Sequence, residues 1–165
     1  MSKYFIGIDN GITGSIGVMD ENGQNVEFIK TPIKKCLEYT KTKQNVSRID
    51  HHTLLKFLHE INEAEDCIAI IERPMVNPGR FKATKSAIRC LEATLICLEI
   101  ECIPYIFVDS KQWQKELLPK GCKKDELKFA SMDIGIRFFP QFKNLIEKQK
   151  DADGLLIAEW ARKKI

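Results

Sequence analysis

The segment Cys67–Ile71 is almost wholly apolar, and this feature constrains the fold of the whole chain. A strand with one face in water alternates apolar and polar residues, whereas a continuous apolar run is typical of a strand that is covered on both faces. Strands of this kind occur in sheets that are flanked by helices. The segment therefore predicts an α/β protein.

Four further segments have the composition of strands, so that the sequence predicts a mixed five-stranded sheet. Tyr4–Asp9 and Ile103–Val108 are short, mostly apolar and contain β-branched residues. Ser15–Asp20 and Asn25–Lys30 flank the dipeptide Asn22-Gly23, which supplies the positive φ angles of a tight hairpin turn. The chain is therefore expected to open with three strands.

Helical spacing of apolar residues predicts helices on the flanks of this sheet. After a basic connection over residues 31–49, Asp50 can cap a helix in which Leu54, Leu58 and Ile61 share one face. The other expected helices run from about 82 to 99, for a short stretch after Asp109 or Ser110, from about 124 to 138 and from about 152 to 164.

The length of 165 residues, or 19.0 kDa, fits one domain that spans residues 1–165. The six cysteines form no C-x-x-C pair and lie mostly in apolar runs, which favours buried thiols in a reducing compartment over disulfides. No segment approaches the roughly 18 apolar residues that cross a bilayer. We therefore expect a cytoplasmic, intracellular protein, located in the host cytoplasm if a phage or virus encodes it, with no membrane partner.

The net charge of +3 excludes a uniformly basic protein, but the charge is unevenly placed. Residues 30–50 hold six basic and two acidic residues, and residues 111–124 hold five basic residues and one acidic residue, so that each stretch carries a net charge of +4. Such patches attract a polyanion, although lysine-rich stretches are also ordinary solvated surface.

Three acidic residues lie where a structural role is hard to find. Asp9 ends the first expected strand and Glu72 ends the apolar one. Asp153 begins the last helix, and helical spacing places it on that helix's apolar stripe of Leu156, Ile157, Trp160 and Ala161. Because an unpaired buried carboxylate is costly, such residues usually pair with a base or coordinate a cation.

If the two strands are neighbours and the last helix begins beside them, the three carboxylates converge on a site suited to Mg²⁺ or Mn²⁺. Each residue also has a structural alternative. Asp153 would interact with the helix dipole, Asp9 would belong to a turn before Asn10-Gly11, and Glu72 would pair with Arg73.

Three motifs in this order resemble the RuvC family of Holliday-junction resolvases, within the ribonuclease H-like superfamily. They are Ile6–Gly17 around Asp9, Ile70–Glu72 and Ala152–Ala158. Sugar kinases and actin-like ATPases begin similarly, but they need two such lobes and more than twice this length. The segment Val108–Lys115 looks more like phage-encoded or otherwise divergent members.

The resemblance implies a ribonuclease H-like fold and a homodimeric endonuclease that nicks four-way or branched DNA symmetrically. By motif, Asp9 would bridge two Mg²⁺ ions in each active site, Glu72 would hold one and Asp153 the other, with Mn²⁺ able to substitute. The family usually has a fourth acidic residue or a histidine three residues before the final aspartate, where this chain has Lys150. Either Lys150 fills this position, or Asp151 does if the helix begins after it, and we favour Asp151.

The resemblance also indicates residues that bind DNA. The family tends to have an aromatic wedge three residues after the catalytic glutamate, where this chain has Met75. Phe81 is a candidate substitute, although an apolar residue at a helix start more often packs into the core. Candidate phosphate contacts are Arg80, Lys82, Lys85, Lys111, Lys123 and Lys124.

The remaining aromatic and imidazole side chains have simpler interpretations, since the histidines lack metal spacing and the tryptophans have apolar neighbours. We expect His51, His52 and His59 on the surface, and Trp113 and Trp160 in the core.

Three alternatives to a junction resolvase stay open: a nuclease acting on RNA or RNA–DNA hybrids, a non-catalytic junction-binding protein, and, least favoured on length, an ATP-using phosphotransferase.

Overall fold

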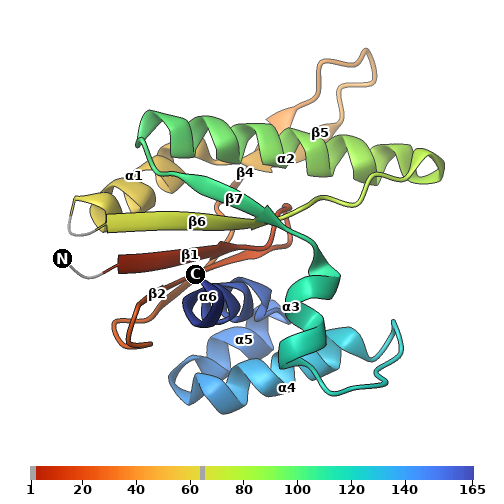
Figure 1. Ribbon diagram of the computed structural model, residues 1–165. Helices are drawn as coiled ribbons and strands as arrows, with labels where there is room; N and C mark the ends of the chain where they lie inside the picture. The colour runs from red at the N-terminus through yellow and green to blue at the C-terminus, as the bar shows by residue number, and fades with distance from the viewer. Residues whose placement is uncertain (1–2, 64–65) are drawn as a thin grey trace.

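The computed structural model describes residues 3–63 and 66–165, and its centre is a five-stranded sheet of the order β3-β2-β1-β6-β7 (Figure 1). β1 runs antiparallel to β2 and parallel to β6, and β7 runs parallel to β6. The predicted mixed five-stranded sheet is therefore confirmed. Its strands are β1 (Lys3–Ile8), β2 (Ser15–Asp20), β3 (Glu27–Lys30), β6 (Asp66–Glu72) and β7 (Tyr105–Val108).

Helices cover both faces of the sheet (Figure 1). One face carries α1 (His51–Asn62) and α2 (Phe81–Ile100). The opposite face carries α3 (Ser110–Leu117), α4 (Leu127–Phe138), α5 (Lys143–Gln149) and α6 (Asp153–Lys164). None of the helices in the described part of the chain combines the length and the apolarity needed to cross a membrane.

β6 has the burial that its apolar sequence predicts. Ala69 and Ile71 face the core that α1 and α2 complete, whereas Ile70 faces the core that α3 and α6 complete. All three side chains are fully buried. The strand is therefore covered on both faces, and the helical layers on its two sides follow from this one segment.

Residues 31–49 are not the plain connection that we expected. They contain a second, two-stranded antiparallel sheet formed by β4 (Ile33–Leu37) and β5 (Asn45–Ile49). Lys34 and Lys35 interrupt the apolar alternation by which β4 could have been recognised in the sequence. An ion pair between Glu38 and Lys85 of α2 holds the hairpin on the body of the protein. Tertiary contact therefore decides this element, rather than local propensity.

Four smaller features differ from the prediction. α5 was not expected, the helix predicted from about residue 124 begins at Leu127, and 3₁₀ turns span Pro78–Arg80 and Pro140–Phe142. The β2–β3 turn is longer than a two-residue hairpin, since β2 ends at Asp20 and β3 begins at Glu27, and its positive φ angles are at Gly23 and Asn25 rather than at Asn22. The cysteines match their prediction in part: Cys67, Cys90 and Cys97 are buried, and no disulfide joins the cysteines of the described residues.

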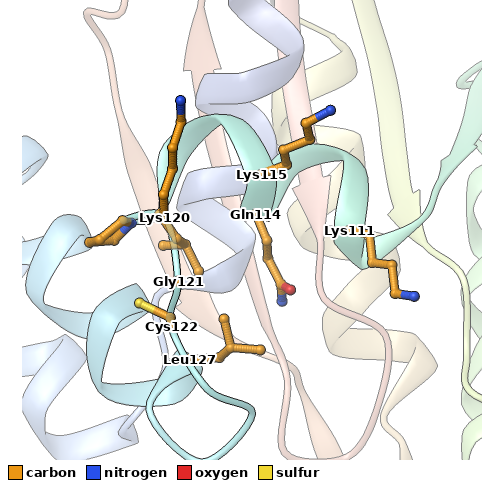
Figure 2. A pocket seen from close by; sticks show the side chains of 9 residues that line it. Lys111, Gln114, Lys115, Lys120, Gly121, Cys122 and Leu127 are labelled. Atoms are coloured by element: carbon orange, nitrogen blue, oxygen red, sulfur yellow. The ribbon is translucent and has the colours of Figure 1, made fainter.

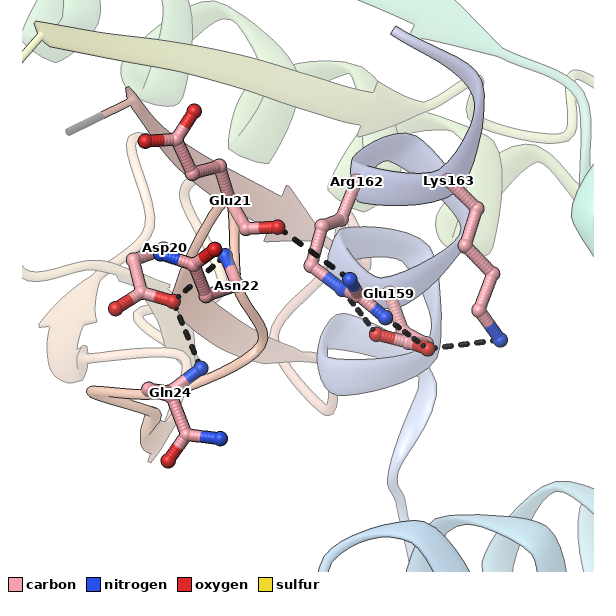
Figure 3. Close-up of polar contacts among 7 residues, drawn as sticks. All are labelled: Asp20, Glu21, Asn22, Gln24, Glu159, Arg162 and Lys163. Carbon is pink, nitrogen blue, oxygen red and sulfur yellow. Dashed lines mark hydrogen bonds and ion pairs between the residues drawn. The ribbon is translucent and has the colours of Figure 1, made fainter.

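Polar contacts hold the C-terminal half of α6 against the β2–β3 turn (Figure 3). The Asp20 carboxylate accepts hydrogen bonds from the backbone N–H groups of Asn22 at 3.0 Å and Gln24 at 2.7 Å. Arg162 donates to the backbone oxygen of Glu21 and to the buried carboxylate of Glu159. α6 is therefore fixed along the sheet at its far end.

The N-terminal half of α6 lies close against β1 and β2, and the backbones approach each other most closely at the glycines of these elements. A Cβ atom on Gly17 of β2 would lie 2.6 Å from the Cα of Leu155, and one on Gly154 would lie 2.7 Å from the backbone oxygen of Ser15. Gly7 of β1 faces the backbone of Gly154 and Ala158 in the same way. The Gly154 N–H also donates to the Ser15 hydroxyl at 3.0 Å.

We predict that Gly17→Ala destabilises the protein by about 3 kcal/mol or more, because the new methyl group must displace backbone rather than a flexible side chain. Gly79→Ala is the control, since a Cβ at Gly79 meets only the side-chain oxygen of Asn77, at 3.3 Å. Urea unfolding followed by circular dichroism measures both variants. Equal stabilities for the two variants would contradict the close approach of α6 to the sheet.

Candidate metal centre

Four carboxylates gather at the carboxyl ends of β1 and β6. Asp9 directly follows β1, Glu72 ends β6, Asp153 begins α6, and Asp151 lies two residues before that helix. All four line one cleft of about 520 Å³. One oxygen each of Asp9, Asp151 and Asp153 lies within 4.8 Å of the others. Asp9 and Asp153, which strand ends and helical spacing predict to converge, both belong to this group, and Glu72 lines the same cleft.

Asp151 reaches the cluster because α6 begins after it. Lys150 directly follows α5 and has the left-handed conformation, with φ 55°, which turns the chain before α6. One carboxylate oxygen of Asp151 accepts a hydrogen bond from the Asp153 N–H at 3.0 Å. Lys150 lines the same cleft, but Asp151 is the residue that lies with Asp9 and Asp153.

Neighbouring side chains fix the orientation of two of the carboxylates. The indole N–H of Trp113 donates to Oε2 of Glu72 at 2.6 Å, and the hydroxyl of Ser131 donates to Oδ1 of Asp153. Trp113 is fully buried, as expected, but its contact with Glu72 was not foreseen. The capping box of Asp109 and Gln112 starts the helix that carries Trp113. It was the sequence signal from which the position of Trp113 after β7 could have been predicted.

Burial raises the pKa of every carboxyl group in the cluster, and repulsion from neighbouring carboxylates adds to the rise at Asp9, Asp153 and Glu72. Burial raises the pKa of Asp9 well above its usual value, and the charges of Asp151, Asp153 and Glu72 raise it further. The same causes raise the pKa of Asp153 to about 7, and burial raises those of Asp151 and Glu72. Lys128 of α4 opposes the rise at the three aspartates.

The donor set fits a divalent cation. Oδ2 of Asp151 is buried and has no hydrogen-bond partner in the described structure, so it is available as a ligand. Carboxylate oxygens are the ligands that Mg²⁺, Mn²⁺ and Ca²⁺ prefer, and a bound cation removes the repulsion between these groups. Asp9, Asp151 and Asp153, with Glu72 beside them, therefore form a candidate metal centre.

A basic groove continues from the carboxylate cleft between α3 and the start of α4 (Figure 2). The groove and the cleft share Gln114 and Leu127 as lining residues. Lys111, a candidate phosphate contact, lines the groove, and the candidate Lys124 lines the cleft. Three further lysines on these surfaces belong to the two basic stretches of the sequence but were not named as contacts, namely Lys115 and Lys120 in the groove and Lys30 in the cleft. Sequence reasoning missed Lys128, which also lines the cleft.

The other candidate DNA contacts lie outside the cluster, mostly at the start of α2. The ring of Phe81 is 70% exposed, so it does not pack into the core as apolar helix starts usually do. Arg80 lines a depression that Glu72 also lines, whereas the ammonium of Lys85 contacts Glu38 at 2.5 Å. The side chains of Lys82 and Lys123 are exposed, as are those of the three histidines, His51, His52 and His59.

Comparison with known proteins identifies the fold. The structure of T. thermophilus RuvC in complex with Holliday junction substrate matches with a TM-score of 0.57 at 18% sequence identity, over 98% of this chain and 96% of that chain. A second Thermus thermophilus RuvC structure gives a TM-score of 0.48 at 17% identity, over 95% and 92% of the two chains. No protein-family model and no curated protein sequence matches the chain. The match with the TM-score of 0.57 shows that the chain shares the fold of this RuvC, which its motifs indicated.

We predict that the metal-free protein loses stability as the pH rises. The folded state keeps the Asp153 proton up to a pH of about 7, whereas the unfolded chain releases it near its ordinary pKa of 3.8, so the loss occurs between these values. Because each pKa unit corresponds to about 1.4 kcal/mol, Asp153→Asn should gain about 2–4 kcal/mol at pH 8 and almost nothing at pH 4.

Urea unfolding in EDTA at the two pH values measures this difference. Asp133→Asn is the control, since Asp133 is an exposed member of an ion pair with Arg137. Equal effects of Asp153→Asn at both pH values would show that burial and the neighbouring carboxylates do not raise the pKa of Asp153 in the folded protein.

Proposed function

We propose that this protein is a metal-dependent endonuclease that resolves four-way DNA junctions by paired, symmetric nicks. The observation that carries the proposal is the half-buried cluster of Asp9, Asp151 and Asp153, in which one oxygen of each lies within 4.8 Å of the others, in a fold shared with RuvC. That RuvC was solved in complex with Holliday junction substrate. The basic groove beside the cleft supports a polyanionic substrate.

In this proposal Asp9, Glu72, Asp151 and Asp153 hold two Mg²⁺ ions, and Mn²⁺ can replace them. When bound, such ions lower the pKa of water and stabilise negative charge on a phosphate. Asp9 directly follows β1, and one of its oxygens lies within 4.8 Å of oxygens of Asp151 and Asp153, so it would hold a cation together with them. Trp113 and Ser131 hold Glu72 and Asp153 in place, so little reorganisation is needed when substrate arrives.

The lysines of the cleft complement the acidic cluster. Lys128 lies close enough to lower the pKa values of the three aspartates, and Lys150 lines the same cleft. We assign the fourth ligand position to Asp151 and assign Lys150 to the phosphate of the bound strand. Lys111 and Lys124 would then position DNA through its backbone, which makes binding depend on salt but does not select a sequence.

Symmetric nicking requires two active sites, so the proposal includes a homodimer. The C-terminal end of α2 offers a surface for it, because Ile100 is exposed there. The chain itself, residues 1–165, would act as one nuclease domain. The absence of disulfides among the described cysteines agrees with a reducing, cytoplasmic location.

Two other functions share parts of this site. A nuclease for RNA or RNA–DNA hybrids would use the same carboxylates. A non-catalytic junction-binding protein would need only the basic surfaces, and it would be favoured if Lys150 replaced an acidic ligand. The position of Asp151 beside Asp9 and Asp153 supports the catalytic alternative.

We predict that the protein nicks a labelled four-way junction in Mg²⁺ but not in EDTA, and that Asp9→Asn slows nicking at least about a hundredfold while junction binding persists. A linear duplex and an RNA–DNA hybrid are offered in parallel, and Asp133→Asn serves as the matched carboxylate control. Cleavage of the hybrid alone would favour the ribonuclease, and tight junction binding without cleavage would favour the binding protein.

A further inference from the structure

We infer that the β4–β5 hairpin is a second DNA-binding element, which acts with the first turns of α2 and stacks Tyr39 and Phe81 on an unpaired base of branched DNA. The inference rests on the proposed function and extends it to a part of the molecule outside the carboxylate cleft. It draws on exposed aromatic rings, local charge, a rigid attachment and a continuous surface that leads to the cleft.

Two exposed aromatic rings from different elements flank one lysine. The side chain of Tyr39, directly after β4, is 85% exposed, and that of Phe81, at the start of α2, is 70% exposed. The ammonium of Lys85 lies 6.0 Å from the Tyr39 ring centroid and 5.9 Å from that of Phe81. Exposed aromatic rings next to a cation are the composition of sites that stack on bases and hold the adjacent phosphate.

The hairpin is fixed on α2 rather than attached only at its base. The Glu38 carboxylate contacts Lys85 at 2.5 Å and Arg89 at 3.6 Å, and its side chain is mostly buried. The Glu38 N–H also donates to the backbone oxygen of Gln44 at 2.8 Å across the hairpin. Tyr39 is therefore presented from a preformed surface, which lowers the entropic cost of binding.

The charge of the hairpin favours DNA over a protein partner. Glu38 is the sole acidic residue between positions 31 and 49, and it is already paired with α2. The basic residues of this segment are Lys34, Lys35, Lys41, Lys43 and Arg48. Lysine is depleted from protein–protein interfaces, and a second copy of the chain would bring like charges together, whereas DNA phosphates neutralise them.

A continuous series of depressions joins the hairpin to the carboxylate cleft. The cleft shares Glu72 and Met75 with a second depression, which Arg80 and Thr84 also line. Thr84 in turn lines a third depression with Phe81 and Lys85 of α2 and with Arg48 of the hairpin. The hairpin loop projects past α2, on the side away from α6 (Figure 1). DNA that enters the cleft can therefore extend along this path to Tyr39.

Photocrosslinking tests the contact directly. The chain of residues 1–165 is bound in EDTA to a four-way junction that carries 5-iododeoxyuridine beside the crossover, irradiated, and analysed by mass spectrometry. We expect crosslinks to the peptides that contain Tyr39 or Phe81, and none there when the same base lies far out on one arm. Crosslinks confined to other peptides, or a chain that binds no junction, would overturn the inference.

Affinity measurements on variants test the energetic role. Tyr39→Ala should weaken junction binding about tenfold, because stacking on one base is worth about 1–3 kcal/mol. Phe138→Ala is the matched control, since Phe138 is also partly exposed and lies 5.3 Å from a lysine, Lys163, outside both basic stretches. An unchanged affinity for Tyr39→Ala would overturn the inference.

The salt dependence of binding tests the lysines of the hairpin loop. Lys41→Gln combined with Lys43→Gln should reduce the slope of log affinity against log salt by about 2 if both contact phosphates. The control pair, Lys56→Gln with Lys163→Gln, removes the same charge from two lysines that sit in ion pairs elsewhere. Equal slopes for the two double variants would overturn the proposed contact of Lys41 and Lys43 with DNA phosphates.

Two further readouts separate the alternatives. If sedimentation without DNA shows that Tyr39→Ala converts a dimer to a monomer, the hairpin is a surface between copies and the inference fails. Nicking in Mg²⁺ is measured on the same variants. If Tyr39→Ala leaves junction cleavage unchanged and no crosslinks form at Tyr39, the DNA-binding role of the hairpin is refuted and the proposed nuclease is not. If crosslinks form at Tyr39 but no cleavage occurs, the proposed nuclease is refuted and the DNA-binding role of the hairpin is supported.

Discussion

The contact between the backbones of α6 and of β1 and β2 is the constraint on which the rest of the structure depends. Gly17 and Gly154 leave no room for a Cβ atom between the helix and the sheet, and Gly7 does the same on β1. This approach brings the start of α6, and with it Asp153, beside the end of β1. A larger residue at any of these positions would move the helix away and separate the carboxylates.

The assembled site is electrostatically unfavourable by itself. Burial of Asp9, Asp151 and Asp153 together raises their pKa values, and Lys128 offsets this only in part. The surrounding fold therefore stabilises an arrangement that gains its full favourable energy only with a bound cation. The hydrogen bonds from Trp113 to Glu72 and from Ser131 to Asp153 hold these two carboxylates close to the others, although their negative charges repel one another.

The extent to which sequence predicts this molecule follows from the range of each interaction. Asp9, Glu72 and Asp153 were predictable, since strand ends and helical periodicity are local. The role of Asp151 was open, because it depends on where α6 begins, and the left-handed turn at Lys150 sets that start. The hairpin was missed because its attachment, Glu38 to Lys85, joins residues far apart in the chain.

Counting bound Mn²⁺ by electron paramagnetic resonance tests the central claim, that the contact of α6 with the sheet assembles a metal-binding carboxylate cluster. At pH 8 the account predicts about two bound ions per chain, a clear loss of binding with Asp9→Asn or Asp151→Asn, and little change with Lys150→Ala. Binding that is indifferent to Asp9 and Asp151, or no binding at millimolar Mn²⁺, would contradict it.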